Sequence, residues 1–202
     1  MDYTFILVEL AIVLGSLTVH EAAHAWTADR LGDPTARLLG RVSFNPVVHI
    51  DPIGTIVLPL LAALSGLPIL GWAKPVPVNV RQLREPRRDF MLVAAAGPAS
   101  NILLAVLAAL VIRAVFGEAS LVRDGLLQVV VINVLLAVFN LVPVPPLDGG
   151  NVLAGLLPQN AAGIFVALRP YGFLVLYALM FTGALSAIVM PPSYFLIRLL
   201  LP

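Results

Sequence analysis

The sequence contains no cysteine, which excludes disulfide bonds and any metal site built from thiolates. It also has little charge. Of its 202 residues 11% are charged and 60% are hydrophobic, whereas about a quarter of the residues in a soluble domain are charged. This composition predicts a protein that crosses the lipid bilayer several times. The net charge is only +1, and no basic tract or aromatic stacking pattern is present, so we expect no nucleic-acid partner.

Polar stretches long enough to form a separate soluble domain are also missing, and no tandem repeat is present. We therefore expect residues 1–202 to form a single membrane domain. The N-terminal residues Met1-Asp2-Tyr3 lack the basic start of a signal peptide, and no small-residue cleavage site follows before His20. The first apolar segment is therefore expected to remain as a membrane span.

Four apolar segments of membrane-spanning length are present, at residues 4–26, 90–112, 126–142 and 171–189. Pro191-Pro192 is expected to end the last one. A short helix is expected at 151–157, and extended or β segments at 37–44 and 76–80. The predicted fold class is an all-α polytopic membrane protein with about four to five transmembrane helices. A re-entrant segment and short extended or β segments near the cytoplasmic side complete it.

Residues 53–71 are apolar but are interrupted by Pro59, Gly66 and Pro68, so they could form one poor span or a re-entrant hairpin. The polar segments on either side, 27–52 and 72–89, are both rich in arginine, which is typical of cytoplasmic loops. A single crossing would put these two segments on opposite sides of the membrane. The charge pattern therefore favours the re-entrant form.

Histidine is scarce, and two of the three histidines lie in the stretch His20-Glu21-Ala22-Ala23-His24. On a helix, residues four apart lie about 40° apart around the axis, so both imidazoles can reach one metal ion. Glu21 lies about 100° round from His20 and is placed to hold a water rather than to ligate. This is the HExxH pattern of zinc peptidases. The plainer reading, two histidines that only bond locally, is less favoured because ionisable groups within membrane segments are usually functional.

A catalytic zinc ion usually has three protein ligands, so a third is expected besides the two histidines. The candidates are, in order, Asp148 and His49, then Asp51 and Glu9. Topology favours Asp148, because the spans before it bring it back to the inner side of the membrane if 53–71 is re-entrant. The same aspartate could instead be a simple turn residue, but the prolines at 143, 145 and 146 forbid a regular helix here. Broken backbone at membrane depth usually lines a cavity or is buried in protein.

Three further polar residues have more than one possible role. Glu9 is eleven residues, close to three helical turns, before His20, so it could extend a polar track to the metal or simply reach the headgroups. His49 could hydrogen-bond near the site or cap the re-entrant segment. Asn140 could cap the end of its helix or donate to a substrate carbonyl.

Taken together, these residues resemble a known family. The motifs His20–His24, Ala96-Gly97-Pro98 with Asn101, and Asn140 to Gly149 are similar to the three signatures of the site-2 protease family of intramembrane zinc metalloproteases. The resemblance covers a core of about residues 4–157, followed by C-terminal helices in 158–202. Residues 40–54 and 71–79 are similar to the short subgroup, which lacks the PDZ and nucleotide-binding regulatory domains.

The resemblance implies one Zn²⁺ per chain held by His20, His24 and Asp148. It also implies that Glu21 is the general base and that Asn140 helps to hold the substrate or the oxyanion. It implies hydrolysis of a peptide bond in or next to a transmembrane helix of a substrate protein. That substrate would be an anti-sigma factor, a membrane-tethered regulator or a remnant signal peptide. The location would be a bacterial or archaeal cytoplasmic membrane, with the active site toward the cytoplasm. The alternative is a non-catalytic membrane protein that binds or transports zinc.

Overall fold

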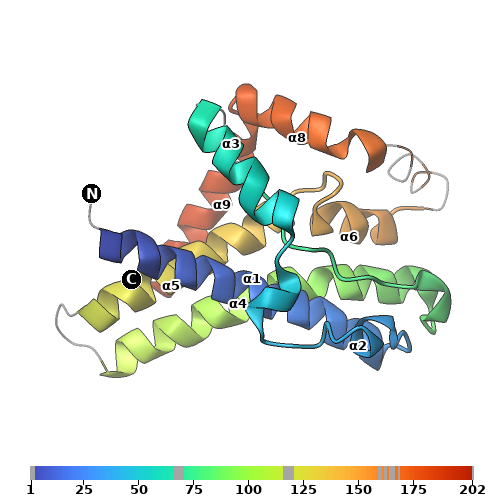
Figure 1. Ribbon diagram of the computed structural model, residues 1–202, viewed down its shortest axis with the longest axis horizontal. Coiled ribbons are helices and arrows are strands. Elements are labelled where there is room, and N and C mark those ends of the chain that lie inside the picture. The colour runs from blue at the N-terminus through green and yellow to red at the C-terminus, as the bar shows by residue number, and fades with distance from the viewer. Residues whose placement is uncertain are drawn as a thin grey trace.

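The computed structural model describes residues 3–65, 71–115, 121–158 and 169–201, together with residues 161, 163 and 167 (Figure 1). The long helices are α1 (Tyr3–Arg30), α4 (Pro86–Val115), α5 (Leu121–Asn140) and α9 (Ala184–Leu200). The shorter ones are α2 (Thr35–Leu38), α3 (Leu58–Ser65), α6 (Asp148–Leu156) and α8 (Gly172–Phe181). Single turns of other helix types are η1 (Pro46–His49), η2 (Pro52–Val57), η3 (Val80–Gln82) and η4 (Arg169–Tyr171).

Helix α4 is at the centre of the fold, packed against α1, α5 and α6. Its buried face carries small residues, among them Ala94, Ala105, Ala108 and Ala109. Small side chains let neighbouring helix backbones approach closely, which is the main source of helix association in a lipid environment. Because α1 and α6 both pack against α4, the sequence motifs on these three helices lie close together.

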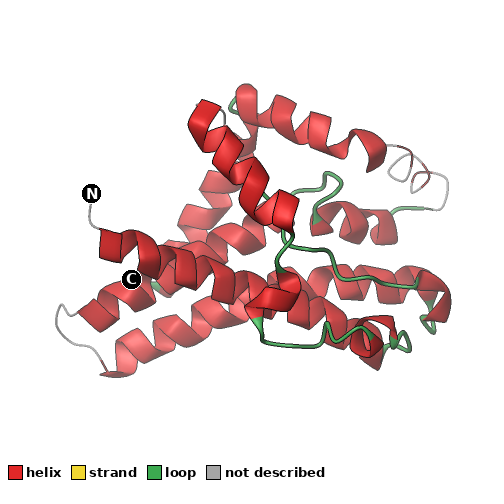
Figure 2. Cartoon of the chain, viewed as in Figure 1, coloured by secondary structure: helices red, strands yellow, loops and turns green. Residues whose placement is uncertain are grey.

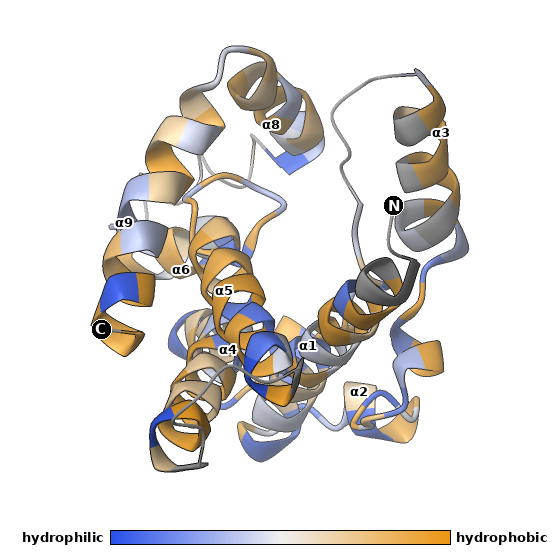
Figure 3. Ribbon diagram, turned by 90° about the vertical axis from the view of Figure 1, so that its left-hand side faces the viewer, coloured by the Kyte–Doolittle hydropathy of each residue, from blue (hydrophilic) through white to orange (hydrophobic). Residues whose placement is uncertain are grey.

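Many large apolar side chains are exposed on the bundle, as contact with lipid requires, and hydrophobic residues occur along its helices (Figure 3). Leu103, Leu107 and Leu110 on α4 are each at least half exposed, with exposed fractions of 58%, 50% and 54%. Three helical stretches are long and apolar enough to cross a membrane: Leu7–Arg30, Pro86–Ala114 and Val122–Asn140. Helices α8 and α9 together make a fourth candidate, bent by 78° between them. The described residues thus provide three or four spans, where the sequence predicted four to five.

The predicted span at 171–189 is not one continuous helix. Helix α8 ends at Phe181, and α9 begins at Ala184 and continues through Pro191 and Pro192 to Leu200. The break lies at Gly183, whose φ of +75° is a left-handed conformation that glycine adopts at no steric cost. A proline inside a helix leaves a backbone carbonyl without its N–H donor. Membrane helices tolerate this where neighbouring groups satisfy the freed carbonyl.

The predicted extended or β segments form no strand in the described part of the chain (Figure 2). Residues 37–44 begin within helix α2 and then turn at Gly40, which has a φ of +69°. Residues 76–79 are extended, as expected from their proline and β-branched content, but they pair with no neighbouring strand. A side chain holds them instead, because Asp33 accepts a hydrogen bond from the Asn79 N–H at 2.6 Å.

The two ends of the apolar segment 53–71 lie side by side. The Lys74 N–H donates to the His49 carbonyl at 2.8 Å, and the Trp72 N–H donates to the Gly54 carbonyl at 3.1 Å. The Thr55 hydroxyl also donates to the Trp72 carbonyl at 2.8 Å. A single membrane crossing would separate these ends, so the hydrogen bonds support the re-entrant form. Residues 66–70 of this segment lie outside the described residues.

Candidate active site

The two histidines of the HExxH motif and Asp148 form one cluster inside the bundle. His20 and His24, one turn apart on α1, are both buried, and their Nε2 atoms lie 3.0 Å apart. The Asp148 Oδ2 atom, at the start of α6, lies 3.1 Å from His20 Nε2 and 3.3 Å from His24 Nε2. The structure therefore brings together the three side chains that the sequence analysis selected as metal ligands.

The other nitrogen of each imidazole is hydrogen-bonded on its far side. His20 Nδ1 lies 2.6 Å from Asn101 Oδ1, and His24 Nδ1 lies 2.6 Å from the Val93 carbonyl oxygen. Both partners are acceptors, so in the neutral form each Nδ1 carries the proton and each Nε2 presents a lone pair. Such a bond on the second nitrogen is the usual arrangement for a metal-binding histidine, because it fixes both the tautomer and the ring orientation.

The donor set fits a zinc ion. Two imidazole lone pairs and a carboxylate oxygen face one another at 3.0–3.3 Å, and the buried Asp148 Oδ2 accepts no hydrogen bond. Without a cation, these three electron-rich atoms would repel one another. Zinc–nitrogen and zinc–oxygen bonds of ~2.0–2.2 Å place the ligands of a tetrahedral site about 3.3 Å apart. The cluster matches this spacing and has the His and carboxylate chemistry that zinc accepts.

Two glycines create the space for the cluster. A Cβ atom on Gly97 of α4 would lie 2.4 Å from His24 Nε2 and 2.5 Å from His20 Nε2. A Cβ on Gly149 would lie 2.2 Å from the Leu141 carbonyl oxygen. The first glycine therefore lets α4 pass directly beside the imidazoles. The second lets α6 begin against the broken segment after α5, which delivers Asp148 to the histidines.

Glu21 lies next to this cluster without belonging to it. It follows His20 on α1 and is partly buried. Its negative charge interacts electrostatically with Arg41, a buried residue in the loop after α2. Burial lowers the pKa of the Arg41 guanidinium below its ordinary value, and the negative charge of Glu21 opposes that shift. Arg41 also donates to the Lys74 carbonyl, which ties the loop to the extended segment 71–79.

The remaining predicted site residues lie outside the metal cluster. Asn140, the last residue of α5, donates through its side chain to the Leu136 carbonyl at 2.9 Å, as a helix-end residue would. His49 is buried, and its Nε2 is bonded to the Ser43 carbonyl at 2.8 Å. Glu9 is exposed near the start of α1. None of the three, nor Asp51, whose carboxylate caps η2, belongs to the cluster in the part of the chain described.

Sequence reasoning missed the polar side chains that support the cluster. Asn101 was recognised only as part of a motif, although it contacts His20 directly. Its amide is in turn bonded to Asn133 of α5 and to Ser16 of α1. The available signal was the presence of two asparagines within spans that are otherwise apolar, because such residues are uncommon in membrane helices unless they have partners.

Comparisons with known proteins indicate a zinc metalloprotease. The sequence profile of Peptidase family M50 matches residues 118–182. The chain is 39% identical over 184 residues to YwhC of Bacillus subtilis (strain 168), covering 87% of this chain and 81% of that protein. It is 34% identical over 184 residues to Rip2 of Mycolicibacterium smegmatis, covering 90% of this chain and 69% of the relative. Both relatives are described by name as zinc metalloproteases.

No solved structure gives a significant match. The two relatives match this chain over most of its length, and their metal is the one that the donor set of the cluster fits. The apolar helices agree with an integral membrane protein. The chain therefore belongs to peptidase family M50, the site-2 protease family, and is a membrane zinc metalloendopeptidase.

Proposed function

We propose that this protein hydrolyses a peptide bond within or next to a transmembrane helix of a membrane-protein substrate. His20, His24 and Asp148 are the zinc ligands, and Glu21 is the general base. One observation carries the proposal: three lone-pair donors converge at 3.0–3.3 Å between helices long enough to span a membrane, one residue from a glutamate.

The reaction divides between the metal and the side chains. When bound, zinc polarises the scissile carbonyl and makes a water acidic enough to react near neutral pH. The Glu21 carboxylate takes the proton of the attacking water and then donates it to the leaving amine. Asn101 and the Val93 carbonyl hold the two imidazoles in the orientation that binding requires. Asn140 keeps one side-chain N–H beyond its bond to Leu136, and we assign that N–H to the substrate carbonyl or the oxyanion.

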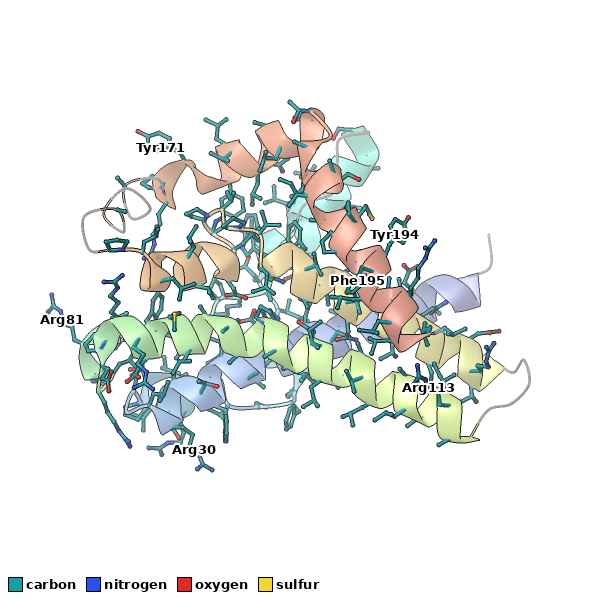
Figure 4. All side chains as sticks on the ribbon, turned by 180° about the vertical axis from the view of Figure 1, so that it is seen from behind. Arg30, Arg81, Arg113, Tyr171, Tyr194 and Phe195 are labelled. Atoms are coloured by element: carbon teal, nitrogen blue, oxygen red, sulfur yellow. The ribbon has the colours of Figure 1, made fainter. Side chains whose placement is uncertain are left out.

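The active site is proposed to face the cytoplasm. Arg30 and Arg81 lie at one end of the α1–α4 pair, and Arg113 lies at the other (Figure 4). His20 and His24 occupy the part of α1 nearer Arg30. Because arginine-rich loops favour the cytoplasmic side, the end with Arg30 and Arg81 is the inner one. The membrane would be the cytoplasmic membrane of a bacterium or archaeon.

A helical substrate must unwind before its peptide bond can be cleaved, since helical hydrogen bonds shield the backbone. Residues 71–79 run as a loop without helix or strand (Figure 2), pair with no strand among the described residues, and begin beside the re-entrant segment. An unpaired extended segment can hold an unwound substrate by adding it as a neighbouring strand. By family resemblance, the substrates are membrane-tethered regulators, anti-sigma factors or remnant signal peptides.

The test is cleavage by the purified chain in lipid vesicles that also contain a synthetic transmembrane substrate. We expect about one zinc ion per chain, cleavage within or beside the substrate's membrane segment, loss of cleavage on chelation and recovery on adding zinc. Zinc at one ion per chain without cleavage of any membrane substrate would contradict the proposal and favour the structural or transport role.

A further inference from the structure

A small polar network is enclosed among α1, α4 and α5, next to the metal cluster. Asn101 and Asn133 have exposed fractions of 0%, and Ser16 is also buried. Asn101 Nδ2 donates to Asn133 Oδ1 at 2.8 Å and to the Ser16 carbonyl at 3.3 Å. Asn133 Nδ2 donates to the Ser16 hydroxyl oxygen at 2.9 Å and to the Val129 carbonyl at 2.9 Å.

The network determines which way the Asn101 amide points. An asparagine side chain can turn over and exchange its oxygen for its NH₂ group, and only the oxygen can accept the His20 Nδ1–H. Two acceptors, the Ser16 carbonyl and Asn133 Oδ1, hold the Asn101 NH₂ group away from His20. Asn133 is oriented in the same manner, because the Val129 carbonyl can only accept. The Val129 carbonyl thus orients Asn133, Asn133 orients Asn101, and Asn101 orients His20.

We propose that Asn133 and Ser16 are positioning residues of the zinc site. By fixing the Asn101 amide, they keep the proton of His20 on Nδ1 and the lone pair of Nε2 directed at the metal. The inference rests on the proposed ligand role of His20. It extends the zinc site to a third helix, α5, which supplies no ligand of its own.

A role in helix packing alone makes a different prediction. Hydrogen bonds between membrane helices contribute modestly to association, so removing a packing bond would lower thermal stability and leave zinc affinity unchanged. Removing a positioning bond would lower zinc affinity, since second-shell changes typically weaken metal binding 10- to 100-fold. Zinc affinity and melting temperature, measured on the same purified chain, separate the two roles.

The first variants are Asn133→Leu and Ser16→Ala, with Ser193→Ala as the matched control. Ser193 on α9 is equally buried, and its hydroxyl donates to the Val189 carbonyl within its own helix. We expect Asn133→Leu to weaken zinc binding about 10- to 100-fold in competition with a chelating dye. Ser16→Ala should weaken it to a smaller degree because the Ser16 carbonyl remains, and Ser193→Ala should leave it unchanged.

A second parent variant, Asn101→Asp, tests whether Asn133 acts through the orientation of the Asn101 amide. In Asn101→Asp the carboxylate has two equivalent oxygens, so it accepts the His20 proton either way round, as carboxylates beside zinc-binding histidines commonly do. Adding Asn133→Leu to Asn101→Asp should therefore change zinc affinity by less than about 3-fold, well below the 10- to 100-fold expected with Asn101 in place. Equal losses in both backgrounds would overturn the proposal.

The ligand assignment is tested separately by His20→Ala. If His20→Ala loses zinc while Asn133→Leu and Ser16→Ala retain wild-type affinity, the positioning role is wrong and the zinc site stands. If His20→Ala binds zinc as the wild type does, the ligand assignment fails, and the positioning role fails with it.

Discussion

Asp148 Oδ2 lies 3.1 Å from His20 Nε2, although one belongs to the start of α6 and the other to the middle of α1. The contact joins the two motifs that the sequence separates most widely. It forms because Gly97 leaves room for the imidazoles beside α4, and Gly149 lets α6 begin against the segment after α5. Its consequence is a compact set of metal donors in a bundle that exposes many large apolar side chains.

Replacing Asp148 with asparagine should sharply lower bound zinc. Asparagine keeps the size of the side chain but removes the charge and can turn an N–H toward the metal position. We expect a loss of zinc affinity greater than the 10- to 100-fold that second-shell changes produce. Metal content after purification measures it, with Asp29→Asn as control. Asp29 pairs with Arg37 away from the cluster. Unchanged zinc in Asp148→Asn would contradict the assignment of Asp148 as the third ligand.

Replacing Gly97 with alanine should damage the metal site without a change in any polar group. The added Cβ would lie within 2.5 Å of both Nε2 atoms, so the imidazoles or α4 must move. We expect zinc binding and cleavage to fall together, by at least about tenfold, as misplacement of catalytic groups by an ångström can cause.

Gly125→Ala is the matched control for this prediction. Gly125 also lies within a helix, α5, and a Cβ there meets nothing within 4 Å. Alanine should therefore raise stability by about 0.5–1 kcal/mol and leave zinc binding intact. Equal zinc binding in Gly97→Ala and Gly125→Ala would show that the imidazoles do not occupy the space beside α4.

The absence of cysteine makes the membrane orientation directly testable. Single cysteines at Leu39 and Arg81 mark the two arginine-rich segments. One at the exposed Val122, at the start of α5 and shortly after the end of α4, marks the end of the bundle where Arg113 lies. In intact cells, a thiol reagent that cannot cross membranes should label only Val122→Cys. Labelling of Leu39→Cys and Val122→Cys but not of Arg81→Cys would put the two arginine-rich segments on opposite sides and refute the re-entrant arrangement of 53–71.

The metal cluster could be predicted from the sequence because the histidines follow a short-range spacing and the order of the membrane spans brings Asp148 to the same side. The spacing of His20 and His24 follows from helix geometry, and the prolines before Asp148 mark a broken segment. The return of residues 53–71 was inferred from arginine distribution and agrees with the hydrogen bonds of Lys74 and Trp72.

The errors arose where tertiary packing decides the outcome. The β-branched residues at 76–80 favour extended backbone, yet they form no ladder because the segment has no partner strand in the described chain. Pro191-Pro192 was expected to stop a helix, but α9 continues through it, and Gly183 makes the break instead. The support of His20 by Asn101 required long-range contacts that a single sequence does not reveal.

The most direct test of the account is Glu21→Gln, measured for zinc content and for cleavage in the same preparation. Glutamine cannot accept a proton from water, so cleavage should fall by about 10²–10⁴-fold or more. Glu21 belongs to no metal cluster, so the variant should still carry about one zinc ion per chain. Zinc retained with cleavage abolished is the predicted result. Cleavage at the wild-type rate by Glu21→Gln would contradict the assignment of Glu21 as the general base.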